Sequence, residues 1–163
     1  MTEIEQLKKD IQLLKDLEEI KTLKAGYIRT MILSQWQEME TLLTEDVEAS
    51  YSDGKYVFNG RQNLMKFLTD LHDATGGDNL AYWVVCLPEI SLTSAVTAKG
   101  TWAMQSYNLN KPHNMEQRQF AYYHDDYVKI DGVWKISRTS YQRVLEEEHD
   151  RSGDTGYTLT VGG

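Results

Sequence analysis

The residue composition of the chain changes at Leu80, and this change restricts the fold more than any other feature. Beyond it, stretches rich in β-branched and aromatic residues follow one another with short breaks, which is typical of strands. Asp131-Gly132 separates the last two stretches and favours the positive φ angles of a tight hairpin turn. Pro88 cannot donate a ladder hydrogen bond, so it marks a bulge or a sheet edge. The predicted strands are Tyr82–Leu87, Glu89–Leu92, Thr97–Leu109, Gln119–Ile130 and Val133–Tyr141.

The first part of the chain is predicted to be helical. Apolar residues recur there at steps of three and four, which places them on one stripe of a helix that ends near Leu33. The heptad-like spacing over Ile4–Leu14 leaves a coiled coil open as an alternative, although only two heptads are present. The stripe consists of Ile4, Leu7, Ile11, Leu14, Leu17, Ile20 and Leu23.

A short mixed segment joins the two parts. Ser52-Asp53-Gly54-Lys55 has the composition of a hairpin turn. A helix is expected before it and another after it, and the helices-first order predicts an α+β fold whose remaining strands are antiparallel. The expected elements are a helix over Ser34–Thr44, strands over Asp46–Tyr51 and Tyr56–Phe58, a helix from Asn59 to about Leu71, and loops over Asp73–Asn79 and Asn110–Asn114.

The length of 163 residues corresponds to about one domain. No repeat or linker interrupts the chain, so a single domain is expected over residues 1–150. Residues 151–163 form a polar tail that is expected to be partly ordered. Within this tail Tyr157–Val161 alternates in polarity and is able to add a strand to a neighbouring sheet.

Charge and composition exclude several classes of partner. Lysine and arginine total 17 and aspartate and glutamate 25, a net charge of −8, which disfavours nucleic acid and anionic membrane surfaces. The longest apolar run is Ala81–Leu87, too short to span a bilayer. The acidic start, Met1-Thr2-Glu3-Ile4-Glu5, is not a secretory signal. A cytoplasmic location is therefore expected.

Sharp catalytic signatures are absent from the sequence. No phosphate-binding glycine loop, dinucleotide fingerprint or nucleophile elbow is present, and we expect no cofactor. The four histidines are scattered and none lies at metal-ligand spacing, so no metal site is expected. Cys86 is the only cysteine, which precludes an intramolecular disulfide. Its apolar surroundings predict a small buried side chain rather than a nucleophile.

Five segments in a fixed order resemble the SnoaL-like branch of the nuclear transport factor 2-like superfamily. The resemblance covers roughly residues 10–150 and is nearest to bile-acid dehydratase, with scytalone dehydratase more distant. It implies a cone-shaped, strongly curved antiparallel sheet wrapped around a long N-terminal helix, with an apolar pocket at the open end. It also implies cofactor-free chemistry and a homodimer or homotrimer. The segments are Ile20–Tyr27, Ser50–Lys55, Pro88–Ile90, Thr97–Trp102 and Asp125–Ile136.

The resemblance also assigns a site. Two dehydratase tyrosines correspond to Tyr27 and Tyr51, and an arginine corresponds to Arg143. The general-base histidine, however, corresponds to Trp83, whose indole donates a hydrogen bond but accepts no proton. The aspartate that orients this histidine corresponds to Ser106, and a further helix aspartate to Ile32. A His–Asp pair is therefore not expected to abstract the proton here.

We expect Tyr27 and Tyr51 to stabilise negative charge on a substrate oxygen. Arg143 is expected either to hold a carboxylate or to lower the pKa of a nearby tyrosine. His124 is the candidate replacement base, because its neighbours of the same parity are largely apolar and suggest an inner sheet face. The expected substrate-binding residues are Ile32, Trp83, Val85, Trp102, Met104, Ser106 and Tyr122.

Each of these four catalytic candidates has a structural alternative. Tyr27 fits a packed core position equally well, and Tyr51 fits a hairpin cap. Arg143 is spaced to pair with Glu146 on the surface, where such a pair contributes little. His124 on an outer face, or bonded to Asp126, has no catalytic role.

Three functions are compatible with these features. The first is a lyase or isomerase without a cofactor, acting on a hydrophobic oxygenated small molecule such as an aromatic, polyketide, terpenoid or steroid compound. The second is a non-catalytic ligand-binding module of the same fold. The third is an oligomerisation domain driven by the N-terminal helix. The contents of the pocket distinguish them, because a pocket filled by bulky side chains excludes both functions that need a ligand.

Overall fold

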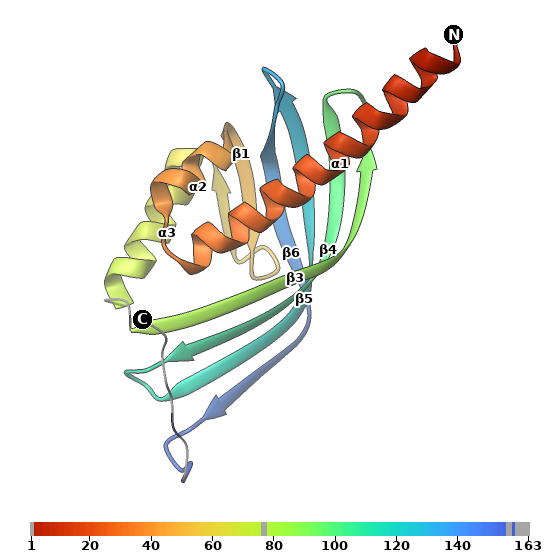
Figure 1. Ribbon diagram of the computed structural model, residues 1–163. Helices are drawn as coiled ribbons and strands as arrows, with labels where there is room; N and C mark the ends of the chain where they lie inside the picture. Colours follow the sequence, from red (N-terminus) through yellow and green to blue (C-terminus); the bar gives the residue numbers. More distant parts are fainter. Residues whose placement is uncertain (1, 76–77, 156–157, 159–163) are drawn as a thin grey trace.

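The computed structural model describes residues 2–75, 78–155 and 158 of the chain. Three helices lie against one strongly bent, six-stranded sheet, which confirms the α+β fold (Figure 1). Within this described part, no helix has both the length and the apolar character needed to cross a membrane.

The long N-terminal helix α1 spans Glu3–Ile32. It begins with a capping box in which the Thr2 hydroxyl accepts from the Glu5 amide at 3.2 Å and the Glu5 carboxylate accepts from the Thr2 amide at 2.7 Å. Farther along, Asp16 fastens α1 to the sheet, because its carboxylate accepts hydrogen bonds from Lys129 and, at 3.1 Å, from the Trp134 indole.

The expected single apolar stripe of α1 divides into two faces. Ile20 and Leu23 are buried against the sheet, whereas every residue from Thr2 to Lys15 is exposed. The physical reason lies in three consecutive steps of three, from Leu14 through Leu17 and Ile20 to Leu23. Each step falls short of a full turn by about 60°, so the three together move the apolar residues to the opposite side of the helix.

The next elements are shorter or shifted relative to the prediction. Helix α2 spans only Trp36–Leu42, because strand β1 begins at Leu43 and runs to Tyr51. The predicted turn leads to β2, Tyr56–Asn59, and Gly54 in this turn has a φ of 87°, which favours glycine. Helix α3 spans Arg61–Thr75.

Four long strands complete the sheet in the order β2-β1-β6-β5-β4-β3. Strand β1 pairs parallel to β6, a pairing that the sequence did not predict, and the other pairs are antiparallel. The prediction for Pro88 is confirmed: β3 is an edge strand, and its register shifts between Cys86 and Glu89. The strands are β3 Asn79–Leu92, β4 Thr97–Asn110, β5 Met115–Ile130 and β6 Val133–Asp150.

The prediction of a buried Cys86 is wrong, because this thiol is exposed. On β3 the side chains of Tyr82, Val84 and Cys86 point to solvent, whereas Trp83 and Val85 on the other face pack against the core. The apolar run therefore supplies both faces of an edge strand. Tyr157–Val161, the possible extra strand, lies outside the described residues except for residue 158, which is not in a strand.

Candidate functional site

Two tyrosines meet at the centre of the fold. Tyr27 from α1 and Tyr51 from the end of β1 are both buried, and their hydroxyl oxygens lie 2.7 Å apart. Burial raises the pKa of each phenol, strongly so for Tyr27, and the neighbouring Tyr51 raises the pKa of Tyr27 further. Both side chains therefore remain neutral phenols that donate hydrogen bonds, which is what stabilising charge on an oxygen requires.

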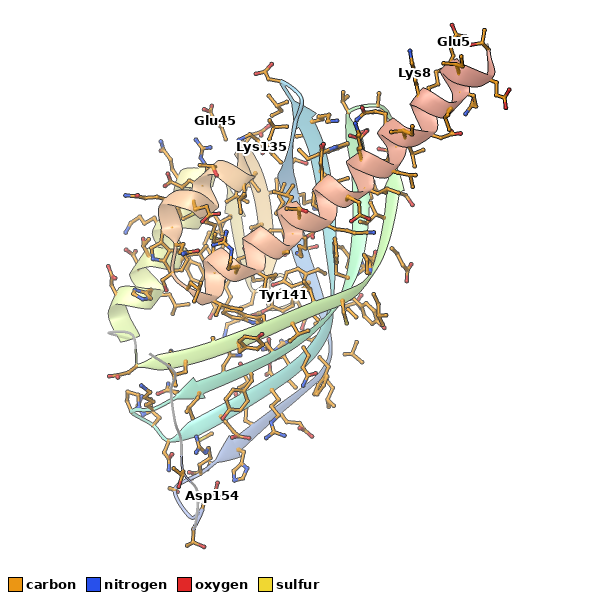
Figure 2. The ribbon with its side chains drawn as sticks, viewed as in Figure 1. Glu5, Lys8, Glu45, Lys135, Tyr141 and Asp154 are labelled. Carbon is orange, nitrogen blue, oxygen red and sulfur yellow. The ribbon has the colours of Figure 1, made fainter. Side chains whose placement is uncertain are left out.

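Two further tyrosines complete an aromatic cluster. The ring of Tyr141 on β6, labelled in Figure 2, stacks on Tyr51 with the ring centres 5.9 Å apart. The ring of Tyr123 on β5 lies edge-on to Tyr141 at 5.7 Å. The Tyr141 hydroxyl lies 3.0 Å from the hydroxyl of Ser52 in the β1–β2 turn. Helix α1 and strands β1, β5 and β6 thus hold the cluster in place.

A cavity of about 640 Å³ reaches this cluster, a size that suits a small-molecule ligand. Tyr51, Tyr123 and Tyr141 line it, and Tyr27 lies behind Tyr51. The remaining wall is mixed, with apolar side chains and with lysine, arginine, glutamate and amide side chains. Apolar lining residues include Ile28, Met31, Phe67, Trp83, Met104 and Leu109, and polar ones include Lys55, Gln119, Arg143, Glu146 and Glu148.

A buried ion pair lies beside the cluster and was not predicted from the sequence. The Lys24 ammonium is 2.7 Å from the Asp125 carboxylate, and neither side chain is exposed to solvent. The same ammonium lies 3.5 Å from the centre of the Tyr123 ring, a cation–π contact. Asp125 also accepts from the hydroxyls of Tyr127 at 2.8 Å and Thr139 at 2.7 Å. A buried, charged pair therefore contacts the aromatic cluster through Tyr123.

One sequence signal for this pair existed. Lys24 precedes Tyr27 by three residues and so shares its helix face, and Asp125 has the same strand parity as Tyr123 and Tyr127. The sequence prediction, however, placed the even-numbered residues of β5 on the inner face of the sheet.

The prediction that His124 faces the pocket is wrong. Residues Ala121, Tyr123, Asp125 and Tyr127 face inward on β5, so the alternation places His124 on the exposed outer face. Its ring nitrogen lies 3.5 Å from the hydroxyl of Thr101 on the neighbouring strand. Tyr122 shares this outer face and is 47% exposed, so its predicted place in the substrate site is also wrong. The apolar character of Phe120, Tyr122 and Val128 misled the prediction.

Arg143 lies in the cavity wall but is already engaged. Its backbone amide and Nε both donate to Asp53, at 2.9 and 2.7 Å, and a terminal nitrogen donates to Glu146 at 2.8 Å. These bonds raise the pKa of the guanidinium. They tie the β1–β2 turn to β6 and match the ion-pair alternative with Glu146 better than an open carboxylate site.

The other predicted binding residues divide into two groups. Trp83 and Met104 line the cavity. Ile32 and Val85 pack against the core, Trp102 is buried and its indole donates to Tyr127 at 2.9 Å, and Ser106 is buried. These four are not among the lining residues. Trp83 and Ser106, where the resemblance expects a histidine and an aspartate, are cross-strand partners on β3 and β4.

A model of the SnoaL-like domain family matches residues 12–140. The chain belongs to this family. The match includes both hydroxyl-paired tyrosines and the Lys24–Asp125 pair, and it ends just before Tyr141 and Arg143.

Several solved structures have the same fold as this SnoaL-like chain. A candidate scytalone dehydratase from Novosphingobium aromaticivorans aligns with a TM-score of 0.76 at 19% identity, covering 93% of each chain. A type 2 hexachlorocyclohexane dehydrochlorinase, LinA, aligns with a TM-score of 0.77 at 16% identity over 94% of this chain and 99% of its own. An NTF2-like protein with a cystatin-like fold from N. aromaticivorans reaches 0.74 at 17% identity, covering 88% and 92%. At these identities the likeness establishes the NTF2-like fold alone.

The SnoaL-like chain shows no group of three or more histidine, cysteine, aspartate or glutamate side chains placed to hold a metal ion within its described residues. The expectations that it needs neither metal nor cofactor stay predictions. Its assembled site consists of neutral phenols at the end of an apolar cavity, with a buried cation–carboxylate pair beside them.

Proposed function

We propose that this protein is a cofactor-independent lyase or isomerase acting on a hydrophobic, oxygenated small molecule in its apolar cavity. The single observation that carries the proposal is the buried contact of 2.7 Å between the Tyr27 and Tyr51 hydroxyls where the cavity ends. One neutral phenol of this pair, supported by the other in a water-poor site, is placed to donate to a carbonyl or alkoxide oxygen on which negative charge develops.

In this proposal Tyr51 touches the substrate and Tyr27 acts through it. Tyr51 lines the cavity, so its hydroxyl hydrogen can be donated to the substrate oxygen. Tyr27 then donates to the Tyr51 oxygen and stabilises the partial charge that Tyr51 acquires. Because burial raises both pKa values, neither phenol is expected to lose its proton at neutral pH in the free enzyme.

The wall of the cavity supports a flat apolar substrate. Trp83, Met104 and Phe67 offer broad apolar surfaces around the tyrosines. An aromatic, polyketide, terpenoid or steroid compound with at least one oxygen fits such a wall. Arg143 is poorly suited to hold a substrate carboxylate, because its Nε and one terminal nitrogen already donate to Asp53 and Glu146.

Elimination or isomerisation also requires a group that accepts the substrate proton. His124 faces away from the cavity, so we assign this role to a carboxylate of the lining. Glu116, Glu146 and Glu148 are the lining glutamates. Because arginine side chains already pair with Glu116 and Glu146, the candidate is Glu148, whose carboxylate accepts from the Gln117 amide at 3.3 Å. Replacing Glu148 by glutamine removes the proton acceptor but keeps a similar shape.

Turnover of a panel of hydrophobic ketones and alcohols by matched variants tests the proposal. We expect Tyr51→Phe to lower kcat by about 10²–10³-fold, the usual effect of losing one such donor, and Tyr27→Phe to have a smaller effect because it acts through Tyr51. Tyr122→Phe is the control, since this tyrosine is on the outer face. Equal rates in all of these proteins would contradict the assigned roles.

A non-catalytic binding module is the second candidate. It is favoured by the closed ion pairs of Arg143 and by the outward position of His124. Thermal-shift and calorimetric titration with the same panel separate the two functions. The binding module is favoured if the wild-type protein binds a compound saturably without turning it over. Tyr51→Phe should then bind that compound more weakly.

We also propose a domain organisation, a cellular location and an oligomeric state for this protein. Residues 1–150 act as one domain, with 151–163 as a tail. The protein acts in the cytoplasm on a small molecule rather than on nucleic acid or a membrane, and it is a homodimer or homotrimer. The net charge of −8 supports the choice against anionic partners.

A further inference from the structure

A row of large apolar side chains on α1 is left without a partner in the fold. Ile4, Leu7, Ile11 and Leu14 are 67%, 58%, 45% and 61% exposed. The N-terminal end of α1, where Figure 2 labels Glu5 and Lys8, projects beyond the strands. Contiguous exposed apolar surface marks sites of protein interaction. We call these four residues the α1 seam.

The α1 seam cannot be covered by the chain's own sheet. The buried residues of α1 that face the sheet include Asp16, Ile20 and Tyr27. At about 100° per residue, the seam lies on roughly the opposite side of the helix from these residues. The sheet therefore covers one face of α1, and the seam on the other face points away from the molecule.

The residue types in the seam match one specific kind of partner. Ile4 and Ile11 occupy the a positions of two heptads, and Leu7 and Leu14 occupy the d positions. Among parallel coiled coils, a β-branched residue at a with leucine at d favours two strands over three or four. The structure exposes all four side chains for such packing.

Charges beside the seam favour the same arrangement with a second copy of the chain. The g positions are acidic, Glu3 and Asp10, and the e positions are basic, Lys8 and Lys15. In a parallel pair each g residue meets the following e residue of the partner, which joins Glu3 to Lys8 and Asp10 to Lys15. An antiparallel pair would place lysine against lysine and acid against acid, which is unfavourable.

We propose that residues 3–15 of α1 pair in parallel with the same segment of a second copy of this chain, through the α1 seam. Each sheet lies on the side of its own helix that faces away from the seam, so the two folds do not collide. Two heptads alone are too short for a stable isolated coiled coil. Here the helix is already formed, since it continues into the segment that Asp16 anchors to the sheet, and pairing needs no helix nucleation.

Sedimentation velocity of the full chain over a range of concentrations tests the proposal. We expect Ile11→Lys, which places a charge in the seam, to weaken self-association by about tenfold or more. Leu13→Lys is the matched control, because Leu13 is 47% exposed in the same turn but lies off the seam. It should associate as the wild type does. A wild type that stays monomeric, or an Ile11→Lys variant that associates normally, overturns the proposal, and the seam then serves another partner.

Disulfide formation tests the parallel orientation. In a Cys86→Ser background, Ile4→Cys should form a covalent dimer with itself under mild oxidation, since a positions face each other in a parallel pair. In an antiparallel pair Ile4 would lie opposite Leu14 instead. Cross-linking only in a mixture of the Ile4→Cys and Leu14→Cys variants, or no cross-linking in either, contradicts the parallel arrangement. Circular dichroism of each variant shows whether its fold is intact.

Discussion

Lys24 places a cation where no solvent reaches it. Burial lowers the pKa of this lysine, and the Asp125 carboxylate opposes that effect. Asp125 receives Lys24, Tyr127 and Thr139, so removing the cation leaves a buried carboxylate with only neutral donors. A buried pair of this kind contributes little relative to an apolar pair but is costly to break on one side.

We therefore predict that Lys24→Met lowers the free energy of unfolding by about 3–5 kcal/mol. Adding Asp125→Asn should recover part of this loss, because the second change removes the unpaired charge. Urea denaturation of both single variants and the double variant measures the coupling. The exposed pair Lys66–Asp70 supplies the control, since Lys66→Met should change stability by at most about 1 kcal/mol. Additive effects at Lys24 and Asp125 would contradict the assigned coupling.

At the scale of elements, β4 needs a glycine beside this network. Gly100 is the register partner of Asp125 on β5. A Cβ atom built on Gly100 would lie 3.0 Å from both the Trp102 indole nitrogen and a Tyr127 ring carbon. These two side chains are joined by a hydrogen bond of 2.9 Å and are held by their surroundings. The absence of a side chain at Gly100 thus leaves room for the contact between Trp102 and Tyr127.

We predict that Gly100→Ala destabilises the fold by about 1–3 kcal/mol, the usual cost of overpacking. Gly26→Ala in α1 is the contrasting variant, because its Cβ would meet only Leu42, at an ordinary 3.6 Å. In a helix interior this change should stabilise by about 0.5–1 kcal/mol. Denaturant unfolding of both variants checks the signs. A Gly100→Ala protein as stable as the wild type would show that Trp102 and Tyr127 move apart easily.

Local patterns predicted elements better than they predicted how elements meet. The helix over α1 and the turns at Gly54 and Gly132 follow from signals within a few residues, and all three are present. The parallel pairing of β1 with β6 joins segments about ninety residues apart, and no short-range signal specifies it. The shortened α2 follows from this pairing, because Leu43 already belongs to the sheet.

The site divides in the same way. The tyrosine pair was expected from the family resemblance, and the hydroxyl contact between Tyr27 and Tyr51 confirms that they converge. The face of β5 was not predictable from polarity, since this strand carries aromatic residues on both faces and its inner face includes the charged Asp125. A carboxylate on an inner face can be predicted from the sequence only when its partner is known, and here the partner is Lys24 on a distant helix.

For the whole molecule, the tyrosines dominate the response to alkaline pH. Tyr27, Tyr51, Tyr123 and Tyr127 come from three different elements and are all buried. Burial is the main cause that raises the pKa of each above its ordinary value of 10.0. The folded protein therefore keeps four phenolic protons that the unfolded chain releases, so the linkage favours unfolding as pH rises.

We predict that stability is unaffected by these tyrosines below pH 10 and falls above it, by about 1.4 kcal/mol per pH unit for each tyrosine. Lys24 acts in the opposite direction, because its pKa is lowered in the fold and the unfolded chain holds the extra proton. Tyrosinate absorbance should therefore show that these four phenols ionise only with unfolding, and Tyr51→Phe should reduce the number of phenols that ionise with unfolding by one. Ionisation of all ten tyrosines before the fold is lost would contradict this, since it requires water to reach the cluster in the native protein.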